Sequence, residues 1–139
     1  MQLRQFGEQD EDQVIELWRT CGLLRQWNNP HRDIERKSRV NPELFLVGLI
    51  NNEIIATAMG GYDGHRGWIN YLAVKPEYQR KGYARQLMEA LEKKLLKIGC
   101  PKINIQVRAE NKSAMDFYKK VGYQSDNVIS FGKRLTKDD

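Results

Sequence analysis

The sequence predicts one α+β domain, residues 1–139, in which helices flank a central, mostly antiparallel, twisted sheet. Two observations lead to this fold class. Segments with helical spacing of apolar residues are interspersed with short β-rich segments, in the order helix, three strands, helix, strand, helix, strand. In addition, 139 residues with 40% apolar and 29% charged side chains suit a single globular domain.

The first half of the chain is predicted to form a helix and then a β-hairpin. Residues 8–21 place apolar side chains at helical spacing, with acidic residues at the start, where the helix dipole favours them. Residues 22–43 are polar and irregular, which indicates loops and a short helix from about Asp33. Two apolar runs on either side of Asn51–Asn52, within residues 43–61, predict the hairpin.

The second half is predicted to alternate strands and helices. Glycines past the last apolar residue mark the helix ends, and Asn111 is a suitable N-cap. A glycine-rich connection, GYDGHRG, comes first. The predicted elements are a strand at 68–74, a helix from Ala84 to Ile98, a strand at 103–107, a helix between Asn111 and Gly122, and a strand at 128–135.

Charge and cysteine content narrow the class of partner. The net charge of +5 suits an anionic partner such as nucleic acid, a phosphorylated cofactor or an acidic protein surface. No apolar run is long enough to cross a membrane and the start lacks a signal-peptide core, so we expect a cytoplasmic protein without membrane contact. Cys21 and Cys100 lack metal-ligand spacing, so we expect two buried thiols and no metal.

The segment QRKGYA, residues 79–84, places a glycine among basic residues where a helix begins. The first N–H groups of a helix have no internal acceptor and bind anions well. A glycine at position 82 would let the backbone approach a pyrophosphate closely. The segment is neither a Walker loop nor a G-x-G-x-x-G turn. The alternative is a basic helix start with a tolerated glycine.

This segment and a second motif further along the chain together resemble the motifs of a protein family. LAVKPEYQRKGYA, residues 72–84, resembles the Q/R-x-x-G-x-G/A signature of the GNAT superfamily of acyl-CoA-dependent N-acyltransferases. VRAENKSAMDFYKKVGY, residues 107–123, resembles the strand-to-helix segment that follows it in that family. The resemblance is clear from about residue 44 to 123, and the GGYDGHRG segment is similar to small bacterial acetyltransferases.

The resemblance implies a GNAT-like fold in which the fourth and fifth strands splay apart and acetyl-CoA binds as the cosubstrate. The backbone at 72–74 would pair with the pantetheine arm like an added strand, and the N–H groups at 80–85 would hold the pyrophosphate. The implied cofactor-binding residues are Leu72, Ala73, Val74, Gln79, Arg80, Lys81, Gly82, Tyr83, Ala84, Arg85, Asn111, Ala114 and Phe117.

The resemblance also implies catalytic roles. Tyr118 matches the family's tyrosine general acid, which would protonate the leaving thiolate; alternatively it is a core tyrosine. Gln106 stands where ribosomal-protein N-terminal acetyltransferases carry a glutamate base, and an amide orients a water or the amine without accepting its proton. His65 is a candidate base. Asp63 is favoured as a turn residue, and a water relay is the third alternative.

The acceptor is expected to be a small-molecule or protein amine, bound by residues 22–43, where this fold selects its substrate. Within them, Trp27 would cover a substrate or pack onto the first helix, and Asp33 and Glu35 would attract a cationic amine or be solvated helix-start acids. The alternatives to an enzyme are a non-catalytic CoA-binding module and, less favoured, a nucleic-acid binder. A homodimer stays open, since the sequence does not fix the oligomeric state.

Overall fold

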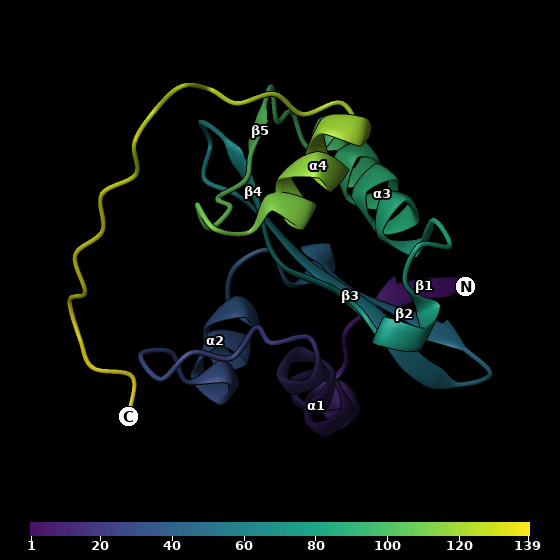
Figure 1. The fold of residues 1–139 in the computed structure, drawn as a ribbon. Helices are drawn as coiled ribbons and strands as arrows, with labels where there is room; N and C mark the ends of the chain where they lie inside the picture. Colours follow the sequence, from purple (N-terminus) through teal and green to yellow (C-terminus); the bar gives the residue numbers. More distant parts are fainter. The chain divides into compact units, whose positions relative to one another are not determined.

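The computed structural model describes residues 1–139, which divide into two compact units (Figure 1). The larger unit comprises Met1–Ile105 and the two C-terminal residues, Asp138–Asp139. The smaller unit is Gln106–Lys137. The larger unit contains the whole sheet and three of the α-helices, and the smaller unit contains the last helix.

Five strands form one sheet in the larger unit, in the same order as in the chain. The strands are β1 (Gln2–Gln5), β2 (Phe45–Ile50), β3 (Glu53–Tyr62), β4 (Gly67–Val74) and β5 (Ile103–Asn104). β1 to β4 pair antiparallel, and β5 runs parallel to β4. The predicted mostly antiparallel sheet is therefore confirmed, although β5 is shorter than the strand predicted at 103–107.

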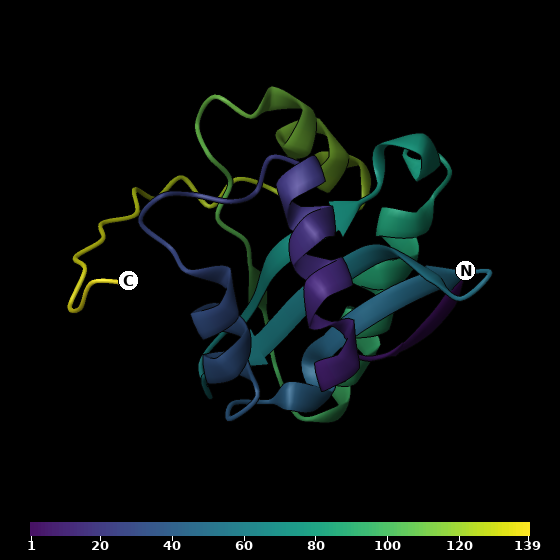
Figure 2. The ribbon, with the colours of Figure 1, turned by 90° about the horizontal axis from the view of Figure 1, so that it is seen from below.

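Helices cover both faces of this sheet (Figures 1 and 2). α1 (Glu11–Thr20) and α2 (Pro30–Lys37) lie on one face, and α3 (Tyr83–Lys97) packs on β3 and β4 from the other. Short 3-10 turns, Glu8–Asp10, Pro42–Leu44 and Pro76–Tyr78, connect the elements. The buried side of α3 consists of apolar residues at helical spacing: Leu87, Met88, Leu91 and Leu95.

The hairpin of β2 and β3 turns at Asn51–Asn52, as predicted. Both asparagines have positive φ, 51° and 62°, which is the backbone of the type I′ turns that suit the twist of a two-residue hairpin. Asparagine tolerates this left-handed region better than most residues, because its short polar side chain bonds locally. The two asparagines are thus the sequence signal that predicted where the β2–β3 hairpin turns.

β1 was not predicted, because its sequence QLRQ is polar and carries no strand signature. It pairs with β2 and is anchored by an ion pair that sequence does not reveal. Arg4 donates from both terminal nitrogens to Asp10, at 2.6 and 2.9 Å, and Gly7 N–H donates to the same carboxylate. Asp10 is 2% exposed, and the hydrogen bond from Arg4 lowers the pKa of this carboxyl.

We expect Asp10→Asn to lower the free energy of unfolding by about 1–3 kcal/mol, because it weakens charge-assisted bonds at a buried site. Urea denaturation at pH 7 measures the loss, with the exposed Asp12→Asn as control. Since folding lowers the pKa of Asp10, its contribution is present above pH 4 and disappears as the pH falls through the folded pKa. A difference between native and Asp10→Asn proteins that does not shrink at low pH would contradict this account.

The smaller unit contains α4 (Lys112–Lys120). Asn111 caps it as predicted, since its side-chain oxygen accepts the Ala114 N–H at 3.1 Å, and Gly122 follows the helix with φ of 101°. The strand predicted at 128–135 is wrong: these residues are exposed and form no regular structure. A local β-rich pattern does not supply the neighbouring strand that a sheet requires.

Candidate functional site

β4 contains a bulge in the middle of the strand. Thr57 pairs with Ala73 and Met59 with Asn70, so Tyr71 and Leu72 together oppose a single residue of β3. Tyr71 has a φ of 51°, which is uncommon for a residue that is not glycine, asparagine or aspartate. Bulges redirect a strand and end its regular pairing, and they are frequent beside functional sites.

A buried hydroxyl holds the bulge in place. Thr57 is fully buried, its Oγ1 donates to the Tyr71 carbonyl at 2.9 Å, and it accepts the Trp18 indole N–H at 2.9 Å. The Trp18 ring stacks on the Tyr71 ring, with centroids 3.8 Å apart. α1 therefore fixes both the backbone and the side chain of the bulged residue.

Beyond its first two residues, β4 has no strand partner on the β5 side. The parallel pairing consists of Gly67 with Ile103 and Trp68 with Asn104. The stretch Leu72–Val74, predicted to pair with pantetheine, begins within the bulge and lies on this open side. At its end, the Val74 carbonyl accepts the Gln79 side-chain amide at 2.8 Å. Gln79 thus links the strand to the loop that leads into α3.

The loop after β4 brings free backbone donors to the start of α3. The N–H groups of residues 80–85 donate to no acceptor in the protein, and the first intrahelical bond there is Gln86 N–H to the Gly82 carbonyl. No acidic residue lies in the first turn. Arg80, Lys81 and Arg85 are exposed around it. Free N–H donors, the positive end of the helix dipole and nearby cations are the features that favour binding of an anion.

Gly82 is required at this place by its backbone conformation. Its φ is 87° and its ψ is 7°, in the left-handed region, and it is the N-cap of α3. A Cβ built on it would meet no atom within 4 Å. The space above Gly82 is therefore open rather than filled by packing, so a ligand has room to approach the backbone here.

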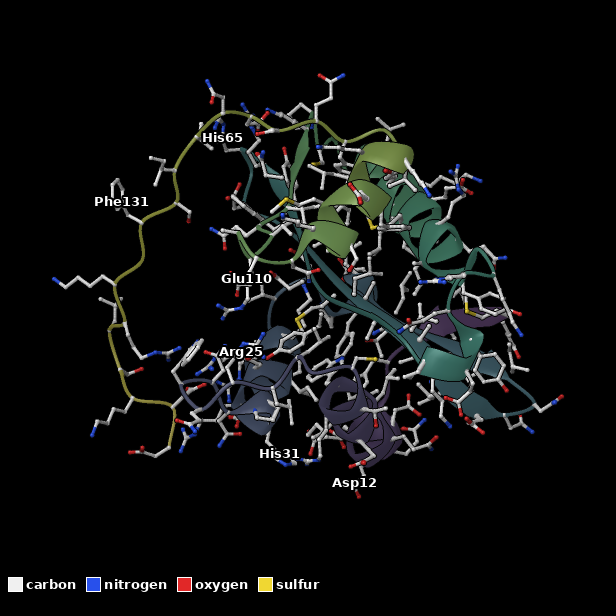
Figure 3. All side chains as sticks on the ribbon, viewed as in Figure 1. Asp12, Arg25, His31, His65, Glu110 and Phe131 are labelled. Carbon is white, nitrogen blue, oxygen red and sulfur yellow. The ribbon has the colours of Figure 1, made fainter.

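His65 lies in the exposed turn between β3 and β4, at the opposite end of β4 from Val74 (Figure 3). Asp63 organises this turn: one carboxylate oxygen accepts the N–H groups of His65 and Arg66, and the other accepts the Trp68 indole N–H. The turn interpretation of Asp63 is confirmed. The role of His65 as a base stays a prediction, and the structure does not bring it to the start of α3.

In the smaller unit, Tyr118 lies in an aromatic cluster. Its ring contacts Phe117 and Tyr123 edge-on, with centroids 5.3 and 6.0 Å away, and its carbonyl accepts the Tyr123 N–H. Burial raises the pKa of Tyr118 to about 12. The phenol is therefore protonated at neutral pH, as a general acid must be.

The other predicted residues of the smaller unit lie on either side of the start of α4. Gln106 precedes it and donates from its side-chain amide to the Ser130 hydroxyl. Asn111 uses its side-chain oxygen as the helix cap, which leaves its amide nitrogen as a donor. Ala114 and Phe117 lie on α4 and are partly buried. Their predicted contacts with the cofactor stay predictions.

Sequence reasoning missed a polar pair beside the bulge. The Tyr71 hydroxyl donates to Asp33 of α2 at 2.6 Å, and Arg36 donates to the other Asp33 oxygen at 2.8 Å. Burial, followed by the bond to Asp33, raises the pKa of Tyr71. The dipeptide Asn29-Pro30 was the signal that α2 begins before Asp33, since Asn29 caps the helix and Pro30 takes its first position.

The acidic, histidine and cysteine side chains do not gather into a metal site. No group of three or more histidine, cysteine, aspartate or glutamate side chains is arranged to hold a metal ion. Cys21 and Cys100 are free thiols, the first partly buried and the second buried. None of the helices combines the length and the apolarity that crossing a bilayer requires.

Known proteins are similar to this chain in sequence and in fold. Acetyltransferases of Yersinia pestis and Yersinia pseudotuberculosis are 49% identical to this chain over 138 residues, which cover 99% of it and 98% of theirs. The aminoglycoside N-acetyltransferase AAC(6')-Iy, solved with a CoA-containing bisubstrate analogue, has a TM-score of 0.78 at 16% identity, with 96% of this chain and 98% of that chain covered.

A ribosomal-protein alanine N-acetyltransferase of Escherichia coli has a TM-score of 0.72 at 21% identity, with 87% of this chain and 76% of that chain covered. At these identities the two solved structures establish the fold, which is the predicted GNAT-like fold. The sequence also matches the profile of the Acetyltransferase (GNAT) family over residues 8–123, which includes both predicted motifs. The chain is an acetyltransferase and belongs to the GNAT family.

Proposed function

We propose that the protein transfers the acetyl group of acetyl-CoA to a primary amine by direct attack. The observation that carries this proposal is the continuity of two binding surfaces within the larger unit. The open side of β4 at Leu72–Val74 leads through the loop into the free N–H groups of residues 80–85. An extended arm that ends in a pyrophosphate matches this pair of surfaces.

The pyrophosphate would lie at the start of α3. Six consecutive N–H groups without acceptors, residues 80–85, would donate to its oxygens, and Gly82 would leave the approach free. Arg80, Lys81 and Arg85 would add charge. The adjoining pantetheine would extend back along β4 from Val74 toward the bulge, so the thioester would lie near Tyr71 and Leu72.

The chemistry needs a neutral amine, because a protonated amine has no lone pair to attack with. The nitrogen would attack the thioester carbonyl carbon, form the C–N bond and leave a tetrahedral oxyanion, which a β4 backbone N–H would stabilise. Collapse would break the C–S bond and return its electron pair to sulfur. Tyr118, which is protonated at neutral pH, would donate a proton to the departing thiolate.

The proton lost by the amine needs an acceptor, and the assigned residues leave two routes. Gln106 would orient the amine or a water molecule, because an amide does not accept the proton. His65 would accept the proton, or water would pass it to solvent. The alignment with the GNAT profile over residues 8–123 includes residues of both units, which supports one N-acetyltransferase domain over residues 1–139.

The acceptor is an amine of a small molecule or a protein, and no metal takes part in the proposed reaction. We also propose a cytoplasmic location, in keeping with the free thiols of Cys21 and Cys100, since reducing compartments keep cysteines unpaired.

Two measurements test the proposal. We expect acetyl-CoA and CoA to raise the melting temperature, because a ligand that binds only the native state stabilises it by mass action. Thiol release from acetyl-CoA with a panel of amines, peptides, polyamines and aminoglycosides then reports turnover. Absence of any shift at millimolar CoA would contradict cofactor binding. Binding without turnover on every amine would favour the non-catalytic module instead.

A further inference from the structure

The chain's own C-terminal residues lie on α2. The Asp138 carboxylate accepts the Asn29 N–H at 2.8 Å and both terminal nitrogens of Arg36 at 3.0 and 2.9 Å. The main-chain oxygen of Asp139 accepts Arg32 Nε–H at 2.8 Å and the Asn29 side-chain amide at 3.2 Å. The side chain of Asp138 is 1% exposed, whereas residues 124–137 before it are exposed throughout.

These donors bind a carboxylate at the surface of α2, and we call the three residues together the α2 pocket: Asn29, Arg32 and Arg36. The positive end of the eight-residue helix α2 lies here, and Arg36 donates to the Asp138 carboxylate from two nitrogens. Bidentate arginine pairs select planar anions by geometry as well as by charge. The hydrogen bonds that Arg36 donates to Asp138 and Asp33 raise the pKa of its guanidinium, which therefore stays charged.

The α2 pocket is joined to the β4 bulge. Arg36 bonds to Asp33 as well as to Asp138, and Asp33 accepts the Tyr71 hydroxyl. The side chain of Asp33 is 24% exposed, so it remains in reach of a ligand. An anionic group and a cationic group therefore lie side by side on α2, next to the place where the proposed thioester would end.

We propose that this face of α2 binds an acceptor that carries both an amine and a carboxylate, such as an amino acid or an acidic peptide. Asp33, with Tyr71, would hold the amine near the bulge, and the α2 pocket would hold the carboxylate. Asp138 and Asp139 occupy the α2 pocket when no acceptor is bound. The proposal names the acceptor class for the proposed acetyl transfer and therefore rests on it.

The position of Asp138 favours a displaceable occupant. A structural ion pair gains from rigid flanking segments, but the 14 residues 124–137 that precede Asp138 have no regular structure and are exposed. A ligand tethered by a segment without regular structure competes at an effective concentration on the order of millimolar. A free acceptor with two recognised groups can displace such an occupant at attainable concentration.

The binding test uses the full-length Asp138→Ala/Asp139→Ala protein, in which the α2 pocket is vacant. The probe is the tetrapeptide Thr-Lys-Asp-Asp, which repeats residues 136–139. By isothermal titration, we expect it to bind the double variant at least tenfold more tightly than the native protein. Adding Arg36→Met should abolish binding, whereas adding Arg39→Met should not, since Arg39 pairs only with Glu35 on the exposed side.

A peptide with asparagine at both acidic positions and an amidated end should not bind. If Thr-Lys-Asp-Asp binds native and double-variant proteins equally, or not at all, then Asp138 does not occupy a carboxylate site and the proposal is overturned. This measurement requires no acetyl-CoA, so its outcome is independent of whether the protein transfers acetyl groups.

The kinetic test compares amino acids and acidic peptides with their carboxamides as acceptors. We expect the double variant to lower KM for carboxylate-bearing amines several-fold without changing KM for the amides, and Arg36→Met to raise KM for the carboxylates alone. Turnover of amines with no preference for a carboxylate would overturn the inference and leave the proposed function standing. Absence of turnover on every amine, with peptide binding intact, would instead overturn the proposed function.

Discussion

Tyr118→Phe is expected to lower kcat by roughly 10²-fold, the scale for losing a positioned general acid, with little change in the affinity for CoA. The substitution removes one hydroxyl and keeps the ring that packs against Phe117 and Tyr123. Steady-state thiol release on an identified acceptor measures kcat, and titration measures CoA affinity. Because burial raises the pKa of Tyr118 to about 12, its ionisation should not lower kcat of the native enzyme below about pH 11.

Tyr123→Phe is the matched control, since it removes a hydroxyl from the same aromatic cluster and has no assigned role. Gln106→Glu is a second variant that tests the proton acceptor, because it places a carboxylate where related enzymes have their base. We expect that variant to gain activity, most clearly below the pKa of the acceptor amine. A rate unchanged by Tyr118→Phe would show that this tyrosine is only a core residue.

Gly82→Asp is expected to weaken CoA binding by at least tenfold, because a carboxylate at the start of α3 repels the pyrophosphate and fills its approach. The control is Gly99→Asp, at the other end of the same helix. Gly99 has a φ of 92°, close to that of Gly82, and a Cβ there also meets no atom within 4 Å. Both variants therefore carry a similar backbone cost.

Thermal unfolding and CoA titration of the two variants separate the loss of stability from the loss of CoA affinity. We expect similar losses in melting temperature, with the loss of CoA affinity confined to Gly82→Asp. Equal effects of both variants on stability and on affinity would mean that Gly82 serves the turn alone, and that the pyrophosphate binds elsewhere.

The sequence predicted those elements whose signals are local. The hairpin at Asn51–Asn52, the start of α3 at Gly82 and the cap of α4 at Asn111 each depend on a residue type with one preferred backbone or hydrogen bond. β1 was missed because its polar sequence carries no strand signal, and its ion pair between Arg4 and Asp10 exists only in the fold.

The residues around the candidate site show the same division between local and long-range signals. The loop proposed to bind an anion was predicted from a glycine among basic residues, and the free N–H groups expected there are present. The pair of Tyr71 and Asp33 was not predicted, because the two residues are 38 positions apart and meet only through the bulge in β4. Arg36 joins them from a segment whose charges looked like an ordinary solvated helix face.

The edge strand β1 and the part of β4 that β5 leaves unpaired also bear on self-association. β1, at one edge, is four residues long and polar, and short charged edges resist pairing with other chains. The open side of β4 would pair with strands of other chains if it were long and regular. The bulge at Tyr71 and Leu72 interrupts it, so only the short stretch Leu72–Val74, which begins within the bulge, remains before the loop. The bulge thus limits unwanted strand addition while leaving a segment that suits a thin, strand-like arm.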